Sequence, residues 1–193
     1  MNSWKLPDTL TVAGTVYHIR TDFRDILTIL SALGDPDLPD AAKAEVMLMI
    51  LFEDFDSIPE KDLEEAANKG MEFINHVPDD GKPDAKKPTL MDWDQDADMI
   101  IPAINKAAGV GDIRSLPYMH WWTFLGYYME IGDCLFSQVL NIRYKHAHGK
   151  KLEKHEREFE KDNRNLIKLK KRLSDDEKER LEEERKALEE MGL

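Results

Sequence analysis

Cysteine is almost absent from this chain: Cys134 is the only one in 193 residues, so no disulfide can form within the sequence. We expect Cys134 to be a small buried thiol in an apolar helix. Long hydrophobic runs are also lacking. The most apolar stretch, residues 116–142, is interrupted by polar side chains, whereas a membrane span needs about 20 mostly apolar residues. The first residues lack the basic and apolar segments of a secretory signal. These features predict a protein of a reducing cytoplasm with no membrane contact.

The sequence patterns of common catalytic sites are missing as well. No Ser or Cys stands in a nucleophile elbow, and Gly109-Val110-Gly111 is typical of a helix end rather than a phosphate-binding loop. His146, His148 and His155 lie close together, but without a cysteine pair or a His-Glu-x-x-His spacing. We therefore expect no enzymatic activity, no cofactor and no physiological metal at these histidines.

An acidic segment near the middle of the chain imitates a calcium loop in part. Asp92, Asp94 and Asp96 stand at alternate positions, as the first ligands of such a loop do. Ala97 then occupies the place of the glycine at the sharp turn, and Ala103 the place of the closing glutamate. The better interpretation is that these acids precede a helix, where the macrodipole favours negative charge.

Positive charge is scarce and unevenly placed. The chain has 27 Lys and Arg against 39 Asp and Glu, a net charge of −12, of which residues 1–144 carry −13 and residues 145–193 carry +1. An acidic body repels a phosphate backbone, so we do not expect it to bind nucleic acid. Residues 145–172 form a locally basic zone with 11 Lys and Arg against 5 Asp and Glu. A solvated face is the first interpretation of this zone, an acidic protein or the chain's own body the second, and nucleic acid the last.

Residue patterns predict a short hairpin followed by helices. β-branched residues surround Ala13-Gly14 within residues 9–20, which is typical of a hairpin. Apolar periodicity then predicts three helices: one capped by Asp22 and ending at Gly34, a core helix capped by Asp40, and one over residues 60–76. Residues 77–89, rich in proline and charge, predict a mobile loop at about 77–90.

The second half predicts two more helices before the basic zone. The first covers residues 98–108, with Pro102 tolerated in its first turn. The second begins at Pro117 and runs to about Tyr144. Gly126 and Gly132 inside it cost about 1 kcal/mol each relative to Ala, so we expect them at close helix contacts.

The aromatic residues of this long helix are the candidates for partner binding. They lie at nearly all angles around the axis, because successive helical residues step by about 100°. One interpretation packs them inside the protein, and the other exposes an aromatic anchor for a partner helix. Arg143 either caps carbonyls at the helix end or pairs with the acidic body. The candidates are Trp121, Trp122, Phe124, Tyr128 and Arg143.

The C-terminal residues predict an exposed charged helix. Ser174-Asp175-Asp176-Glu177 has the pattern of a capping box. Leu181 and Leu188 are seven residues apart, but one or two heptads are too few for a convincing coiled coil. Dimerisation through this helix stays open.

Several short sequence motifs, taken in order, resemble those of one phage family. Asp96-Ala97-Asp98 precedes a short helix, His120-Trp121-Trp122-x-Phe124 follows, and then comes Asn141-Ile142-Arg143. Near the N-terminus, Tyr17-His18-Ile19-Arg20 and Asp22-Phe23-Arg24 fit the same pattern. Over residues 4–172 the chain resembles the gp-fifteen type of bacteriophage protein, found in phages with long flexible tails.

This resemblance implies a non-enzymatic tail assembly chaperone in the host cytoplasm. It would bind the long helical tape-measure protein, and other tail proteins are further potential partners. The resemblance implies no catalytic residue. Two alternatives stay open: a structural adaptor that remains in the virion and self-associates through its C-terminal arm, and a nucleic-acid-binding regulator acting through residues 145–172.

The predicted fold class is mainly α. We expect a compact helical bundle with a short N-terminal β-hairpin over residues 1–144, and a charged helical C-terminal arm over residues 145–193. The two sides of the loop near residue 80 look too small for independent cores, so they should pack together.

Overall fold

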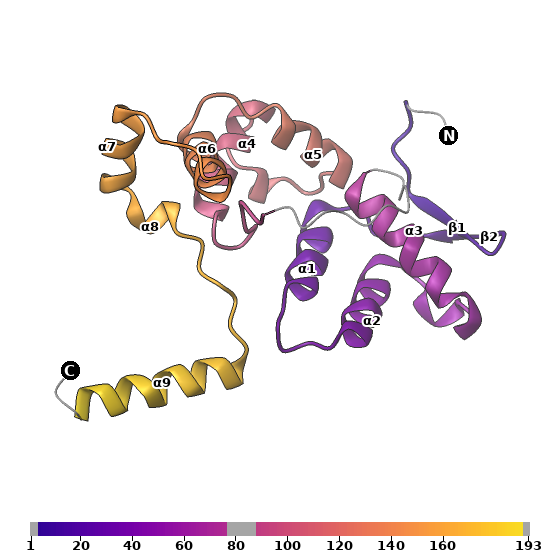
Figure 1. Ribbon diagram of the computed structural model, residues 1–193. Coiled ribbons are helices and arrows are strands. Elements are labelled where there is room, and N and C mark those ends of the chain that lie inside the picture. The colour runs from indigo at the N-terminus through magenta and orange to yellow at the C-terminus, as the bar shows by residue number, and fades with distance from the viewer. Residues whose placement is uncertain (1–3, 77–87, 191–193) are drawn as a thin grey trace.

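The computed structural model describes the backbone of residues 4–76 and 88–190, and the side chains of these residues up to Lys186. This part of the chain is mainly α-helical with a short two-stranded hairpin, as the sequence predicts (Figure 1). The elements are β1 (Thr9–Val12), β2 (Thr15–His18), α1 (Phe23–Leu33), α2 (Asp40–Leu51), η1 (Phe55–Ser57), η2 (Glu60–Asp62), α3 (Leu63–Asn75), α4 (Ala97–Ala108), η3 (Ile113–Ser115), α5 (Trp121–Met129), α6 (Leu135–Ala147), α7 (Lys154–Asp162), α8 (Arg164–Ile167) and α9 (Asp175–Glu190). Most of the predicted loop at 77–90, namely residues 77–87, lies outside the described residues.

The hairpin turns where the sequence indicates. Ala13 and Gly14 both have positive φ angles, 47° and 80°, as a primed two-residue hairpin turn requires. The backbone N–H of Ala13 donates to Oε1 of Glu65 in α3 at 3.0 Å. A two-stranded hairpin is marginally stable alone, so this packing on α3 helps to hold it.

Helix α1 has the predicted cap and the predicted core face. Oδ1 of Asp22 accepts a hydrogen bond from the backbone N–H of Arg24 at 3.0 Å. Phe23, Ile26 and Ile29 are buried. The apolar residues that the sequence predicts for one side of this helix therefore face the core.

Helix α2 is the core helix that was predicted, since Met47, Leu48 and Leu51 are buried. Its N-terminus differs from the prediction. Pro39 occupies the N-cap position, and Asp40 is the first helical residue, with no side-chain cap hydrogen bond. The charge of Asp40 still lies in the first turn, where the helix dipole favours it.

Helix α3 packs closely against α2 through a glycine. It starts at Leu63 after the 3-10 turn η2, so the predicted helix over residues 60–76 is correct apart from its first turn. A Cβ atom on Gly70 would lie 2.9 Å from Cδ2 of Leu51, closer than such atoms approach. A glycine at this position permits the short distance between the two helices.

The predicted single helix from Pro117 to Tyr144 is wrong. The structure has two helices there, α5 and α6, separated by residues 130–134 (Figure 1). Cys134, expected inside a buried helix, is a half-buried N-cap of α6 with extended backbone at φ −158° and ψ 178°. Apolar residues before and after the break make the sequence pattern look like one continuous helix. Gly132, inside the break, is a poor helix former.

Two smaller predictions are also corrected. Gly126 is not at a close helix contact, because no atom of another described element lies within 4 Å of the position of an added Cβ. Gly132 likewise has open space around it. Pro102 lies inside α4 beyond the first turn, because the helix already begins at Ala97.

Helix α5 joins the elements before residue 77 and those after residue 87 into one hydrophobic core. The rings of Phe124 and Phe23 stack with centroids 4.7 Å apart. Nε1 of Trp121 donates to the carbonyl oxygen of Ile74 in α3 at 2.8 Å. The backbone N–H of Trp121 donates to the carbonyl oxygen of Thr21 at 2.7 Å. The halves on either side of residue 80 therefore pack together, as predicted.

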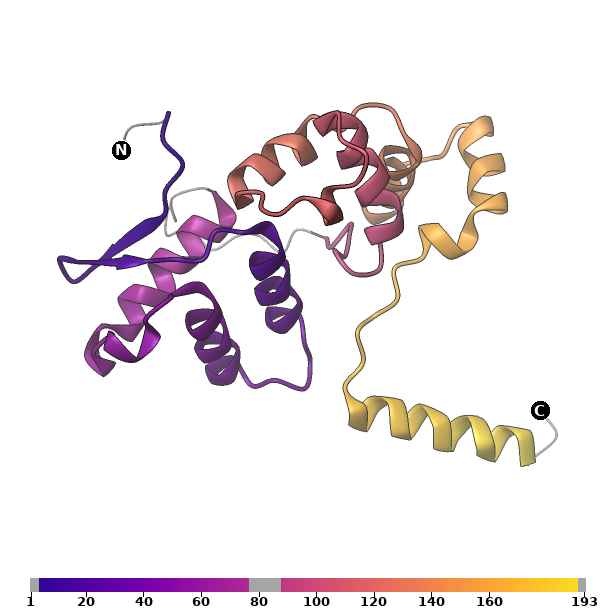
Figure 2. The same ribbon diagram turned by 180° about the vertical axis from the view of Figure 1, so that it is seen from behind.

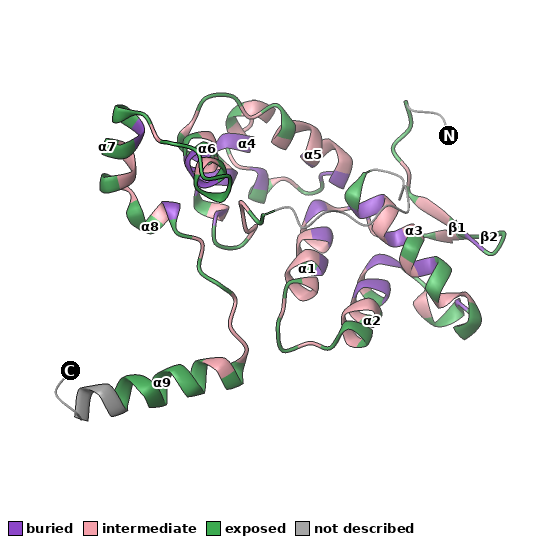
Figure 3. Ribbon diagram, viewed as in Figure 1, coloured by how far each residue is buried: buried purple, intermediate pink, exposed green. Residues whose placement is uncertain are grey.

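The last helix, α9, extends away from the rest (Figures 1 and 2). It follows an extended segment, residues 168–174, and its surface is mostly exposed (Figure 3). The predicted capping box is present: Ser174 Oγ accepts from the N–H of Glu177 at 3.2 Å, and Glu177 Oε2 accepts from the N–H of Ser174 at 3.1 Å. None of the helices in residues 4–76 and 88–190 is long and apolar enough to cross a membrane.

Candidate functional site

The structure separates the predicted partner-binding aromatics by their exposure. Trp121 and Phe124 are each only 2% exposed and belong to the core. Trp122 and Tyr128 are half-buried on the same helix. A buried ring offers no contact area to a partner, so Trp121 and Phe124 pack α5 against the core. Trp122 and Tyr128 stay predictions as partner contacts.

Trp122 is held against the end of α3. Its Nε1 donates to the carbonyl oxygen of Phe73 at 2.9 Å. Its ring stacks on that of Phe73 at 5.7 Å and meets the ring of His76 at 4.2 Å. Any partner would therefore meet a fixed edge of Trp122 rather than a mobile ring.

His120, for which the sequence shows no partner, organises the start of α5. Its Nδ1 accepts from the backbone N–H of Trp122 at 3.0 Å, and its Nε2 lies 2.9 Å from the carbonyl oxygen of Pro7. Burial lowers the pKa of His120, although Pro7 and the charge of Asp8 oppose this shift. The neutral imidazole therefore serves as the helix cap.

Sequence reasoning missed Trp93, which lies within the acidic segment. Its ring is 5.0 Å from Tyr128, 5.9 Å from Phe124 and 6.1 Å from Trp121, measured between centroids. The segment is thus anchored on α5 by an aromatic contact. Burial raises the pKa of Tyr128, and the negative charge of Asp96 adds to the effect.

Arg143 pairs with the acidic segment, as one of its two predicted roles requires. Its Nη1 donates to Oδ2 of Asp96 at 2.7 Å and its Nη2 donates to Oδ1 at 2.9 Å. The two side chains are only 7% and 2% exposed. This is a buried, two-point ion pair between α6 and the start of α4.

The remaining donors of Arg143 bind backbone carbonyls. Nη1 also donates to Leu90, Nη2 to Leu166 and Nε to Ile167. The guanidinium group therefore ties residues 90–96 and residues 166–167 to α6. Since the side chain is buried and fully used, it is a structural clamp rather than a surface for a partner.

Arg172 forms a second clamp on the same acidic segment. Its Nε donates to Oδ2 of Asp92 at 2.8 Å, and its Nη2 donates to Oδ2 of Asp94 at 2.6 Å. Nη1 donates to the carbonyl oxygen of Ser31 at the end of α1 at 3.2 Å. Gln95 and Lys170 add two hydrogen bonds: Gln95 Nε2 donates to the Lys170 carbonyl at 2.8 Å, and Lys170 N–H donates to Gln95 Oε1 at 2.9 Å.

The electrostatics of this second clamp agree with its geometry. Burial raises the pKa of Asp92, but hydrogen bonds and charge from Arg172, with backbone N–H donors, outweigh it and leave the pKa below its ordinary value. Asp92 in turn raises the pKa of Arg172. Both groups therefore keep their charges over the whole physiological range.

The acidic segment thus has a different role from the one the sequence suggested. The prediction of helix N-terminal acids is incomplete, because Asp92, Asp94 and Asp96 bind two arginines. Arg143 and Arg172 lie 47 and 80 residues from their carboxylate partners, and no local pattern reveals such a pairing.

The histidine region is an ordinary surface junction in the structure. His146 Nε2 lies 2.7 Å from Glu160, and His155 Nδ1 lies 3.5 Å from Glu153. In residues 4–76 and 88–186, no three His, Cys, Asp or Glu side chains converge as a set able to hold a metal ion.

Large apolar side chains remain exposed outside the aromatic core. Met129 is 68% exposed and Leu135 is 42% exposed, and they flank the break between α5 and α6. Met49 of α2 and Val16 of the hairpin are also exposed. We call the exposed residues Met129 and Leu135 the α5–α6 turn surface.

Together these features define a small, mainly helical protein in which two arginine clamps fix an acidic segment and a charged arm. The chain belongs to the family described as Bacteriophage Gp15 protein, whose match covers residues 3–174. Membership makes it a phage structural or morphogenesis protein. The match confirms the resemblance seen in the sequence, and it ends just before α9. Comparison with curated proteins and with solved structures found no match.

Proposed function

We propose that this protein is a non-enzymatic tail assembly chaperone. It binds the phage tape-measure protein in the host cytoplasm, keeps the apolar stripes of that long helical protein from aggregating, and releases it as the tail tube forms. The observation that carries the proposal is the family match over residues 3–174, which includes the whole clamped body. No cofactor is needed, since the mechanism is binding and release.

The exposed apolar side chains support this proposal and suggest where the client would bind. The α5–α6 turn surface presents Met129 and Leu135 to solvent, and Tyr128 on α5 is half-buried. Methionine is flexible and polarisable, so it suits a surface that must accept varied apolar partners. Covering such side chains with a client helix removes apolar area from water, which favours binding.

The test is co-expression with the tape-measure protein of the same phage, followed by a pull-down and a solubility comparison. Co-purification and rescued solubility are expected. The double variant Met129→Ser, Leu135→Ser should lose both effects, while the matched control Val16→Ser, an exposed apolar residue in the hairpin, should keep them. Absence of both association and rescue with the unaltered chain would refute the chaperone mechanism.

A structural adaptor that stays in the virion is the second candidate. One observation favours it: α9 lies beyond the family match and extends from the body with an exposed surface (Figure 3). Mass spectrometry of purified particles separates the two functions. A stoichiometric amount of the protein in mature virions supports the adaptor, whereas its absence from them supports the chaperone.

A further inference from the structure

Helix α9 presents charge to solvent along most of its length. It meets the body at its first turn, where the N–H of Asp175 donates to Oδ1 of Asp37 at 2.9 Å. Residues 179–186 are all exposed. The helix has nine Asp or Glu residues and four Lys or Arg residues, a net charge of −5. Two α9 helices would therefore repel one another.

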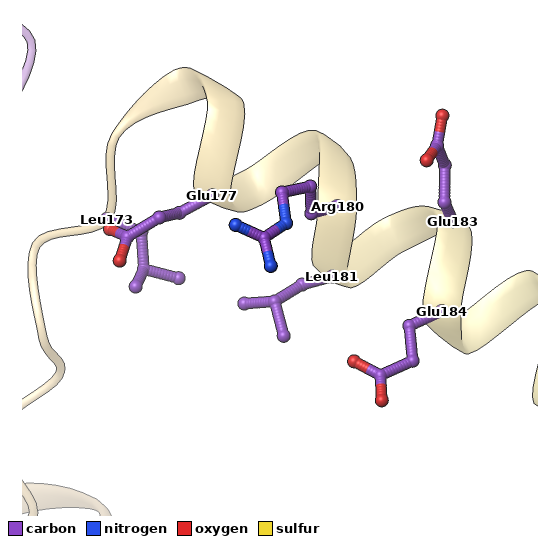
Figure 4. Close-up of a pocket in the computed structure, with 6 residues that line it drawn as sticks. All are labelled: Leu173, Glu177, Arg180, Leu181, Glu183 and Glu184. Atoms are coloured by element: carbon purple, nitrogen blue, oxygen red, sulfur yellow. The ribbon is translucent and has the colours of Figure 1, made fainter.

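Three acidic residues gather on one side of α9, with Arg180 and Lys186 flanking them. Asp176, Glu179 and Glu183 follow the i, i+3, i+7 spacing, so they lie on the same side of the helix. Figure 4 shows Glu183 pointing away from the side that carries Leu173 and Leu181. We call Asp176, Glu179 and Glu183 the acidic stripe.

The acidic stripe is available to basic side chains of another molecule. The ion pairs along the helix use other carboxylates: Lys178 pairs with Asp175 at 2.7 Å, and Lys186 with Glu182 at 3.2 Å. No side chain in the described ranges forms a salt bridge with the acidic stripe.

Helices α7 and α8 present the complementary charge. Arg157, Lys161, Arg164 and Lys168 line one groove together with Glu160 and Ile167. The four cations follow one another at intervals of four, three and four residues, and all are exposed. No carboxylate among the described residues forms a salt bridge with them, since nearby Glu160 pairs with His146 instead. We call these four residues the cationic groove.

We propose that the acidic stripe of one copy binds the cationic groove of a second copy. Within one chain, Arg172 and the Gln95–Lys170 pair fix the segment that leads into α9, and the helix extends away from the body (Figure 2). A second copy supplies the matching charge without disturbing these clamps. Because the two surfaces differ, the contact is head to tail, and its repetition gives a ring or an open chain.

The test uses the full-length chain in sedimentation velocity experiments over a range of concentrations. Self-association is expected at about 50 mM salt and is expected to weaken at about 500 mM salt, because exposed charges are screened. The stripe variant Asp176→Asn, Glu179→Gln, Glu183→Gln removes the charge of the acidic stripe. The groove variant Arg157→Gln, Lys161→Gln, Arg164→Gln, Lys168→Gln does the same for the cationic groove.

Each variant alone should associate at least about tenfold more weakly than the unaltered chain, a loss of about 1.4 kcal/mol. Mixing the two variants should give a heterodimer and nothing larger, because one intact stripe then meets one intact groove. A matched control changes three exposed acids of the body, Glu45→Gln, Asp56→Asn and Glu60→Gln, and should associate like the unaltered chain.

Three results would overturn the proposal. The first is an unaltered chain that stays monomeric at low salt and high concentration. The second is a stripe variant that associates as strongly as the unaltered chain, which would show that another surface mediates the association. The third is a mixture of the two variants that forms no heterodimer. Circular dichroism of each variant shows whether its helices are retained.

Discussion

At the scale of single residues, the buried pair of Arg143 and Asp96 ties α6 to the start of α4. The side chains are 7% and 2% exposed, and Arg143 also binds carbonyls from two other stretches of chain. Removing one partner of a buried pair leaves an uncompensated charge in a poorly solvated place.

Arg143→Met should therefore destabilise the protein strongly. We expect a loss of about 3–5 kcal/mol in the free energy of unfolding, measured by urea denaturation. The matched control is Arg114→Met, because Arg114 pairs with Asp112 at 2.7 Å at an exposed position. That variant should leave the urea midpoint nearly unchanged. Equal losses in the two variants would contradict the clamp role of Arg143.

Glu156 should make stability depend on acid pH. A hydrogen bond from Lys145, with others from Glu153 N–H and Asn141, lowers the pKa of Glu156 from 4.5 to about 2. Because the folded-state pKa is depressed, its stabilisation is complete above pH 4.5 and disappears as the pH falls towards 2. Glu156→Gln should lower the urea midpoint at neutral pH, and the difference from the unaltered chain should shrink across this window.

The control for this titration is Glu158→Gln, an exposed residue of the same helix with no salt bridge to the described side chains. It should give the same pH profile as the unaltered chain. A Glu156→Gln difference that stays constant down to pH 2 would refute the assignment.

At the scale of helices and strands, packing distance decides what a helix can tolerate. Helices α2 and α3 approach closely at Gly70, whereas α5 has open space at Gly126. Replacing glycine by alanine favours the helix by up to about 1 kcal/mol in both places. The difference in packing should therefore decide whether the substitution raises or lowers the free energy of unfolding.

Gly70→Ala should destabilise the protein, because the new methyl would lie 2.9 Å from Cδ2 of the fully buried Leu51. Overpacking of this kind costs about 1–3 kcal/mol, which offsets or exceeds the helix gain. Gly126→Ala should instead raise the free energy of unfolding by about 0.5–1 kcal/mol. Thermal unfolding of the two variants checks the direction in which each changes the free energy of unfolding. Stabilisation by Gly70→Ala would disprove the close contact.

At the scale of the whole molecule, Arg172 connects parts that are distant in the sequence. It binds Asp92 and Asp94 of the acidic segment and the carbonyl of Ser31 at the end of α1. Its position just before α9 means that this clamp also sets where α9 leaves the body.

Arg172→Ala should release this segment without unfolding the core. We expect faster hydrogen exchange in residues 168–178, measured by mass spectrometry, with exchange of α1, α2 and α5 unchanged. The reason is that the lost hydrogen bonds lie outside the apolar core, and local opening reports local stability. Lys171→Ala, which changes an exposed neighbour paired with Glu177, is the control and should show little change beyond that pair. Unchanged exchange in Arg172→Ala would contradict the clamp.

The sequence alone was enough for several features that depend on neighbouring residues, although the predicted cap at Asp40 was wrong. The hairpin turn at Ala13-Gly14, the cap at Asp22 and the capping box at Ser174 all follow from contacts within a few residues. The amphipathic helices and the family resemblance were also readable, because periodicity and short motifs are properties of the chain itself.

Only the tertiary structure decided the rest, because burial and charge pairing depend on residues that are far apart in the sequence. The break between α5 and α6, the burial of Trp121 and Phe124, and the binding of Arg143 and Arg172 to one acidic segment all require the folded neighbours to be in place. An aromatic residue or an arginine has the same local pattern whether it faces the core or a partner. The difference is made by what packs against it.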